Sequence, residues 1–178
     1  MPGETVERTT TKNIVVNSKK RITVGISDMK VSNDPGSFLI THSLGPCIGL
    51  IIYDPRVNAG GMLHYQLSSS KGHEERAKQN PMMFADTGIP LLFQEVERLG
   101  ANRNNLQISV FGGASMLKDD QIFKIGIQNS RAAKKILWQL CVKIKHEDVG
   151  GNVSRTVGID LETGIIQLQK EGSTIQLT

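Results

Sequence analysis

The chain has 178 residues, of which 38% are hydrophobic and 21% charged, and its net charge is +4. This composition is typical of one globular domain, and no apolar run approaches the roughly 18 residues of a membrane-spanning helix. Aromatic residues make up only 4% and basic residues are scattered along the chain, which argues against nucleic-acid binding. Two cysteines, Cys47 and Cys141, are too few for a disulfide framework and indicate reduced thiols in the cytoplasm.

The first part of the chain is expected to form strands. Residues 1–18 are polar and lack periodicity, which predicts a flexible tail in front of a single domain at residues 19–178. Residues 21–31 alternate between apolar and polar or small side chains, and residues 37–43 form a second short strand after an Asn-Asp-Pro-Gly turn. The nearly continuous apolar run at 47–54 predicts a central strand that is buried on both faces.

The middle of the chain is expected to form one more strand and then two helices. Residues 60–67 are expected to pair with the preceding strand in a hairpin, whereas the polar residues 68–81 are expected to form a mobile loop. Apolar side chains recur at helical spacing in 84–100 and in 127–141, and a strand at 105–114 separates these two helices.

The end of the chain completes the expected fold. Residues 142–170 predict two or three final strands with a turn at Gly164. This order of elements indicates an α+β fold, in which mixed or antiparallel sheets pack like a sandwich and are flanked by two main helices.

One cysteine and one histidine are predicted to meet in the hairpin. Cys47 begins its first strand, and His64 lies near the end of its second. With a turn near Arg56, antiparallel pairing brings residue 47 opposite roughly residue 65, so both side chains lie at one end of the hairpin. In such a pair the imidazole takes the thiol proton and the thiolate attacks a carbonyl carbon. The alternative is that Cys47 only fills space, as most buried cysteines do.

Nearby residues suit such a site. Thr41, on the neighbouring strand, is expected to orient the histidine through its hydroxyl or carbonyl group. Gly45 permits an unusual backbone conformation before the cysteine, and backbone amides there are expected to hold an oxyanion. Gly60 and Gly61 allow another segment of the chain to approach closely.

The other cysteine and histidines are assigned to ordinary environments. Cys141 ends an amphipathic helix and is expected to lie in the core, while His42 should point away from the face that Thr41 occupies. His73 and His146 are expected at the surface. No histidines or cysteines have the spacing of a zinc site, and nucleotide-binding glycine motifs are absent, so no metal or organic cofactor is expected.

Several motifs, taken in order, resemble one known family. The motifs are THSLGPCIGLIIYDP at 41–55, GGMLHYQL at 60–67, FGGASML at 111–117, IGIQNS at 125–130 and DVGGNVSRTVGIDLETGIIQL at 148–168. Each is weak alone, but together they extend over most of the chain and are similar to the chemoreceptor glutamine deamidase family CheD.

The resemblance implies a cysteine hydrolase with the fold of the cytotoxic necrotising factor toxins. It implies Cys47 as nucleophile, His64 as base and Thr41 as the residue that orients the histidine. The implied reaction converts glutamine side chains of methyl-accepting chemotaxis receptors to glutamate with release of ammonia, and some members are also credited with methylesterase activity. The implied partners are the cytoplasmic helices of these receptors and a CheC-type phosphatase, without membrane insertion.

The sequence departs from the family pattern beside the nucleophile. Pro46 stands where the family has serine, and Ser43 stands where it has glycine. Proline has no N–H group and a fixed φ, so any contribution of the serine amide or hydroxyl is lost. One alternative hypothesis is therefore a non-enzymatic or weakly enzymatic adaptor that binds receptors and CheC. A further alternative is a cysteine amidase or esterase that acts on other proteins.

Overall fold

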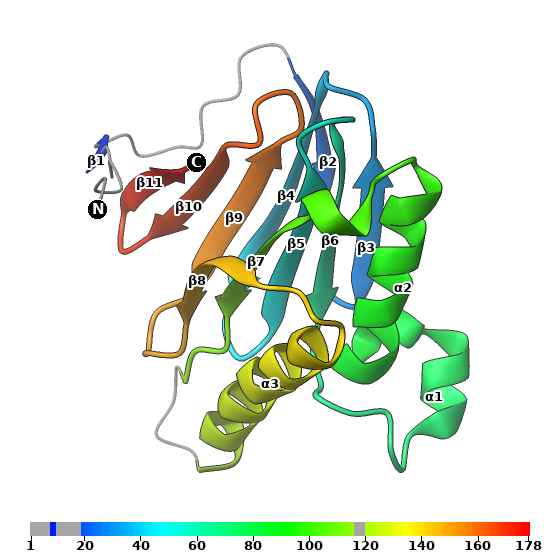
Figure 1. Ribbon diagram of the computed structural model, residues 1–178. Helices are drawn as coiled ribbons and strands as arrows, with labels where there is room; N and C mark the ends of the chain where they lie inside the picture. The colour runs from blue at the N-terminus through cyan, green and yellow to red at the C-terminus, as the bar shows by residue number, and fades with distance from the viewer. Residues whose placement is uncertain (1–7, 10–18, 116–119) are drawn as a thin grey trace.

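The computed structural model describes residues 8–9, 19–115 and 120–178 (Figure 1). Most of the expected tail, residues 1–7 and 10–18, lies outside the described residues, as do Met116 and Leu117 of the FGGASML motif. Within the tail, Arg8–Thr9 form a short strand, β1, which pairs with the last strand of the chain.

In the described part of the chain, eleven strands form two sheets. One sheet has six strands, in the order β1 (Arg8–Thr9), β11 (Ser173–Leu177), β10 (Ile166–Lys170), β9 (Arg155–Asp160), β4 (Ser37–Leu44) and β2 (Lys20–Thr23). The other has five, in the order β3 (Asp28–Ser32), β6 (Ala59–Tyr65), β5 (Ile48–Asp54), β7 (Gln107–Gly112) and β8 (Ile144–Val149). Each sheet contains one parallel pair, β2 with β4 and β7 with β8, among antiparallel pairs. The prediction of an α+β fold with mixed sheets is confirmed.

Helices cover the outer face of the five-stranded sheet (Figure 1). The helices are α1 (Glu74–Gln79), α2 (Ala85–Arg98) and α3 (Asp120–Gln139), with single 3₁₀ turns at η1 (Pro81–Met83) and η2 (Arg103–Asn105). Helix α1 interrupts the segment that was expected to be a loop, and α3 begins seven residues before the expected start at 127. None of the described helices is long and apolar enough to cross a membrane.

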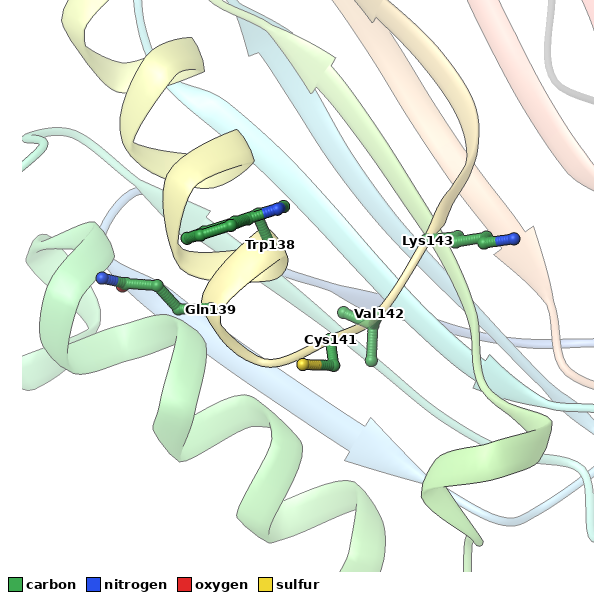
Figure 2. A pocket seen from close by; sticks show the side chains of 5 residues that line it. All are labelled: Trp138, Gln139, Cys141, Val142 and Lys143. Carbon is green, nitrogen blue, oxygen red and sulfur yellow. The ribbon is translucent and has the colours of Figure 1, made fainter.

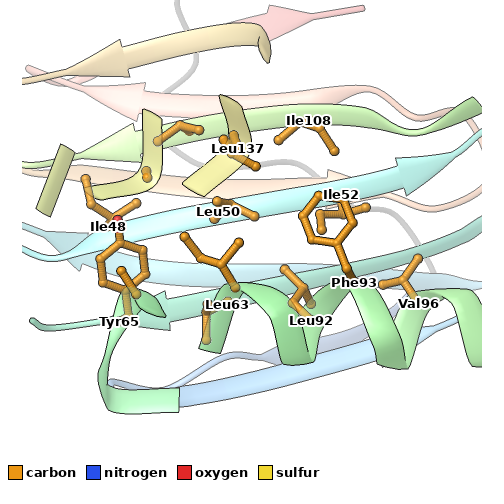
Figure 3. Close-up of a cluster of buried hydrophobic side chains, with 14 residues drawn as sticks. Ile48, Leu50, Ile52, Leu63, Tyr65, Leu92, Phe93, Val96, Ile108 and Leu137 are labelled. Atoms are coloured by element: carbon orange, nitrogen blue, oxygen red, sulfur yellow. The ribbon is translucent and has the colours of Figure 1, made fainter. Parts of the chain in front are cut away.

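Strand β5 is the central strand of the five-stranded sheet and is buried on both faces, as its sequence predicts. Ile48, Leu50 and Ile52 point toward α2 and α3 (Figure 3), whereas Ile51 and Tyr53 pack against the six-stranded sheet. Each fully buried aliphatic side chain of this size contributes about 1.5–3 kcal/mol to folding. The strand is therefore a rigid mount for the residues at its end.

The pairing of β5 with β6 determines the direction in which the His64 side chain points. Ile48 pairs with Tyr65 and Gly49 pairs with His64, which confirms the expected hairpin. Because Tyr65 points toward the helices, alternation along β6 turns His64 to the opposite face, into the space between the two sheets.

Candidate active site

Thr41 and His64 form a buried pair between the sheets. The Oγ1 atom of Thr41 lies 2.8 Å from Nδ1 of His64 and donates its own proton to the carbonyl oxygen of Val24, also at 2.8 Å. Because that hydroxyl proton is already used, Nδ1 of His64 is the donor in their contact, which leaves Nε2 unprotonated. The strand that carries Thr41, β4, comes directly before β5 in the chain but belongs to the other sheet, so this contact joins the two sheets.

Cys47 lies one residue before β5. Like Gly49, two residues later, it is on the side of the strand that faces the six-stranded sheet. Its side chain is half-buried and packs against the apolar cluster between the sheets. Gly49 is directly opposite His64, so Cys47 and His64 are diagonal neighbours at one end of the hairpin. A Cβ atom at Gly49 would come within 2.8 Å of Leu44, which explains why glycine occupies this position.

The thiol and the imidazole do not form a hydrogen bond in this structure. The Nε2 atom of His64 is buried and makes no hydrogen bond to any residue that the structure describes. The structure thus brings Thr41 and His64 into contact and places Cys47 near them, at the same end of the hairpin. The Cys47 thiol has to come within hydrogen-bond distance of Nε2 before a proton can pass between them.

The pKa values describe a neutral pair. Burial raises the pKa of the Cys47 thiol, and a hydrogen bond from the backbone amide of the same residue opposes this shift. Burial lowers the pKa of His64 to about 4, although the carboxylate of Asp28, which is paired with His64 across β3 and β6, opposes that shift. Near neutral pH the pair is therefore a thiol and a neutral imidazole. The arrangement suits base-assisted attack, in which His64 removes the proton as the sulfur bonds to carbon.

The end of β7 holds the loop that carries Cys47. The amide of Gly113 donates to the carbonyl oxygen of Cys47, and the amide of Ala114 donates to that of Gly45, both at 2.8 Å. Gly112 has a φ of +111°, and a Cβ atom there would lie 2.2 Å from the Cys47 carbonyl oxygen. The FGGA segment is therefore a backbone clamp. Since the amides of Gly113 and Ala114 are occupied, neither is available to an oxyanion.

Asn129 of α3 joins both strands of the hairpin. Its side-chain Nδ2 atom donates to the carbonyl oxygens of Pro46, at 2.9 Å, and of Gln66, at 2.7 Å. The hydroxyl of Tyr65 donates to the backbone carbonyl of Asn129 at 2.7 Å. One buried amide thus fixes the residue before the nucleophile and a residue two positions after the histidine.

The role of Asn129 was not identified from the sequence, although a sequence feature pointed to it. Asn129, Ala133 and Leu137 lie four residues apart on the buried stripe of an amphipathic helix, and Asn129 is completely buried. A polar residue on such a stripe needs hydrogen-bond partners inside the protein. A Cβ atom at the preceding Gly126 would lie 2.6 Å from the carbonyl oxygen of Gly113, so glycine lets α3 pack directly on the FGGA clamp.

A second clamp comes from the DVGG segment. The amide of Gly150 donates to the carbonyl oxygen of Gly112, and the amide of Ser115 donates to that of Gly151, both at 2.8 Å. Arg155 is nearly fully buried, binds Asp148 at 3.0 Å through Nε and also donates to the carbonyl oxygen of Gly150 at 2.7 Å. The DVGG segment therefore holds the end of β7, which in turn holds the loop that carries Cys47.

The two departures from the family pattern have different structural consequences. Ser43 lies in an irregularity of β4 between Thr41 and Leu44 and has a φ of +55°, a conformation that favours glycine. Pro46 takes part through its carbonyl oxygen, which accepts the hydrogen bond from Asn129. Any residue can supply a carbonyl oxygen, so proline keeps this contact.

Other residues from the sequence analysis lie apart from the site. Cys141 is exposed, with a φ of +57°, because α3 ends at Gln139 and the chain turns outward there; the expectation that it lies in the core is wrong. His42 is exposed on the other side of β4, and His73 is exposed and stacks on Phe84 at 5.9 Å.

Close packing at the hairpin also explains its paired glycines. A Cβ atom at Gly60 would lie 2.8 Å from Leu161, and one at Gly61 would lie 2.7 Å from Leu92. The expected close approach of other segments is therefore confirmed. Among the residues that the structure describes, no group of three histidine, cysteine, aspartate or glutamate residues is placed to hold a metal ion.

Comparison with known proteins relates the chain to one family. The family model described as "CheD chemotactic sensory transduction" matches residues 66–170. The protein named "Probable chemoreceptor glutamine deamidase CheD 1" of Syntrophus aciditrophicus is 44% identical over 155 residues, covering 87% of this chain and 97% of that protein. A "Probable chemoreceptor glutamine deamidase CheD" of Solibacter usitatus is 45% identical over 158 residues, which cover 89% and 94% of the two chains. The protein of the same name from Syntrophotalea carbinolica is 40% identical over 151 residues, which cover 84% of this chain and 93% of that protein.

Proposed function

Because the chain belongs to the CheD family, we propose that it hydrolyses the side-chain amide of selected glutamine residues in chemoreceptors. The observation that carries the chemistry is the contact between Thr41 and His64, which leaves Nε2 as a proton acceptor on the face that Cys47 shares. Cys47 is the nucleophile, His64 is the general base and acid, and Thr41 orients His64.

The first half of the reaction forms a thioester. The Sγ atom of Cys47 bonds to the carboxamide carbon of the glutamine while its proton passes to Nε2 of His64. The backbone amide of Cys47, which hydrogen-bonds its own sulfur before the attack, stabilises the tetrahedral oxyanion once the sulfur has bonded to carbon. The amides of Gly113 and Ala114 bind other carbonyl groups. When the C–N bond breaks, Nε2 returns the proton to the leaving nitrogen, which departs as ammonia.

The second half restores the enzyme. Water attacks the thioester carbon while Nε2 of His64 accepts one of its protons. The C–S bond breaks, the sulfur recovers that proton from His64, and the product is a glutamate side chain. Thr41 holds the imidazole in the tautomer that both halves need, because its hydroxyl accepts from Nδ1 and donates to Val24.

The proposed setting is the cytoplasm, with the cytoplasmic helices of the receptors as substrates and a CheC-type phosphatase as a further partner. Each turnover replaces a neutral amide by a carboxylate on a receptor helix. The added charge changes the repulsion between packed helices and so shifts the signalling equilibrium.

The test uses a cytoplasmic receptor fragment and mass spectrometry of its glutamine-containing peptides. The protein is expected to convert specific glutamines to glutamates with release of an equal amount of ammonia, and Cys47→Ala and His64→Gln are expected to abolish both. Conversion that persists in Cys47→Ala would remove Cys47 from the mechanism. No conversion of any receptor fragment would count against the substrate. Conversion of unrelated glutamine-rich helices at the same rate would favour a broader amidase.

Two observations favour a second candidate, an adaptor that binds receptors and a CheC-type phosphatase with little chemistry of its own. The pKa of Cys47 is raised by burial, and Nε2 of His64 has no hydrogen-bond partner among the described residues. For an adaptor, Cys47→Ala would keep both binding and the signalling phenotype. Loss of the phenotype in a Cys47→Ala protein that still folds and binds would exclude this candidate.

A further inference from the structure

The single tryptophan of the chain is exposed at the far end of α3. The side chain of Trp138 is 78% accessible, although burial of a tryptophan removes 150–250 Å² of surface from water. Beside it is a hollow of about 540 Å³ lined by Trp138, Gln139, Cys141, Val142 and Lys143 (Figure 2). The hollow lies away from Cys47 and His64, so the proposed chemistry does not explain it. Exposed tryptophans beside such hollows are typical anchors of protein interfaces.

Positive charge lines the exposed side of the helix that carries this tryptophan. Residues 124–146 contain six lysines and arginines and no aspartate or glutamate. In the sequence these bases look scattered, but Lys124, Arg131 and Lys135 recur on the exposed side of α3 that continues to Trp138. Lys143, just before β8, is exposed at the rim of the hollow. We call these five residues, Lys124, Arg131, Lys135, Trp138 and Lys143, the Trp138 face.

The other two bases of this segment already have partners. Lys134 forms an ion pair with Glu147 at 2.5 Å, and Lys145 donates to the side chain of Gln107 at 3.0 Å. Among the side chains that the structure describes, the Trp138 face therefore carries four cations and one large aromatic side chain. Its complement is a surface with carboxylates and an apolar side chain between them.

We propose that the Trp138 face is a second docking site for the receptor substrate, which binds an acidic stretch of receptor helix away from the glutamine being hydrolysed. This inference rests on the proposed function. Deamidation leaves glutamates on the receptor helices, so a receptor with several modified positions presents the carboxylates that this face complements. Trp138 packs against the helix, and the cations pair with its glutamates.

The spacing between Asn129 and Trp138 along α3 is short enough for one substrate molecule to contact both the nucleophile and the Trp138 face. Trp138 follows Asn129, which holds the loop before Cys47, by nine residues. At 1.5 Å per residue this is roughly 14 Å along the helix axis, well within the 30 Å length of a 20-residue helix. One receptor helix bundle therefore reaches both the nucleophile and the Trp138 face. Each deamidation adds a charge that strengthens docking, so later glutamines of the same receptor are hydrolysed more efficiently than the first.

The kinetic test compares a receptor cytoplasmic fragment with a short peptide that contains only one target glutamine. Trp138→Ser and the double variant Lys135→Glu/Lys143→Glu are expected to raise KM for the fragment about 10-fold, equivalent to about 1.4 kcal/mol, with kcat unchanged. Neither substitution should change kcat/KM for the peptide. The matched control is Lys20→Glu, which reverses an exposed charge on β2 of the other sheet. An unchanged KM for the fragment in both variants would overturn the docking site and leave the proposed function standing.

A binding test separates the two proposals when no turnover is possible. Because Trp138 is the only tryptophan, its fluorescence in the Cys47→Ala protein reports directly on this face when the receptor fragment lacks tryptophan. We expect the emission to shift to the blue on binding. Fragments with glutamate at the target positions should bind more tightly than fragments with glutamine, and binding should weaken at high salt. No shift with either fragment, or a shift only with anionic vesicles or duplex DNA, would overturn the inference. A shift without deamidation by the parent protein would instead count against the proposed chemistry.

Discussion

Thr41 and His64 belong to different sheets, and the 2.8 Å hydrogen bond between them crosses the space where the two sheets pack. The orientation of the proposed base therefore depends on the sandwich as a whole as well as on the hairpin that carries it. Val24, which follows β2 in the six-stranded sheet, completes the arrangement by accepting the threonine proton.

Replacement of Thr41 by valine tests this arrangement. Valine has nearly the same shape but no hydroxyl, so Nδ1 of His64 loses its acceptor and the preferred tautomer is no longer fixed. We expect kcat to fall by about 100-fold, and the free energy of unfolding to fall by about 1–2 kcal/mol. Thr41→Ser, which keeps the hydroxyl, is the control and should retain most of the activity. Equal activity of the valine and serine variants would show that the hydroxyl does not position the base.

Asn129→Ala tests whether α3 positions the nucleophile. The substitution leaves the carbonyl oxygens of Pro46 and Gln66 without the donor that now joins them. We expect a loss of about 2–4 kcal/mol in the free energy of unfolding and a kcat roughly 10- to 100-fold lower, because the Cys47 loop is less well placed. Gln128→Ala, one residue earlier and exposed, is the matched control. A kcat that stays at the parent value in folded Asn129→Ala would restrict Asn129 to a stabilising role.

The hairpin with Cys47 and His64 is predictable from sequence because both of its determinants are local. The apolar run at 47–54 indicates a strand buried on both faces, and the short connector with Arg56 leaves little choice but antiparallel pairing. The order of strands and helices likewise predicts the α+β class. The family resemblance adds the roles of Cys47, His64 and Thr41, which spacing alone leaves open.

Contacts between distant segments were not predictable in the same way. The pairing of β4 with β9 places Thr41 in the six-stranded sheet, and nothing near Thr41 in the sequence indicates a partner more than a hundred residues away. The same holds for Asn129, whose partners Pro46 and Gln66 lie more than sixty residues earlier in the chain. Cys141 was misplaced because its position depends on where α3 ends, and helix ends are poorly fixed by periodicity.

Gly112→Ala tests the backbone clamp at the end of β7. Gly112 and Gly100 both have positive φ, +111° and +97°, so alanine strains the backbone at each position by roughly 1–3 kcal/mol. Only at Gly112 does the new Cβ atom meet another group, the carbonyl oxygen of Cys47 at 2.2 Å; at Gly100 nothing lies within 4 Å. We expect urea unfolding to show a loss for Gly112→Ala that exceeds that of Gly100→Ala by about 3 kcal/mol, with a lower kcat in Gly112→Ala alone. Equal losses would mean that the clamp can move aside.

Pro46→Ser restores the residue of the family pattern next to the nucleophile. The structure uses the carbonyl oxygen of residue 46, which accepts from Asn129, and serine supplies the same oxygen. We therefore expect Pro46→Ser to keep kcat for a receptor fragment in the range of the parent protein. A large gain in kcat would instead show that the serine amide or hydroxyl takes part in the reaction, and that the parent enzyme works without it.

The buried neutral imidazole of His64 predicts how stability depends on pH. The pKa of His64 is lowered from 6.5 to about 4 by burial, so between these values the unfolded chain binds a proton that the folded protein does not. The contribution of His64 to the free energy of unfolding is thus fully present above pH 6.5. It falls by roughly 3 kcal/mol as the pH is lowered to 4. Asp28 and Asp148 have pKa values lowered from 3.8, so their contributions are lost mainly below this window.

Urea unfolding of the parent protein and of His64→Gln between pH 4 and pH 7 measures this effect. Glutamine does not titrate, so the stability of the variant should decline less across the window, and the difference between the two proteins should shrink toward pH 4. Parallel curves would show that His64 is accessible to protons in the folded state, in which case an imidazolium forms readily beside Cys47. The pH dependence of kcat would then have an acid limb near the ordinary pKa of histidine, whereas the buried neutral base predicts a limb near pH 4.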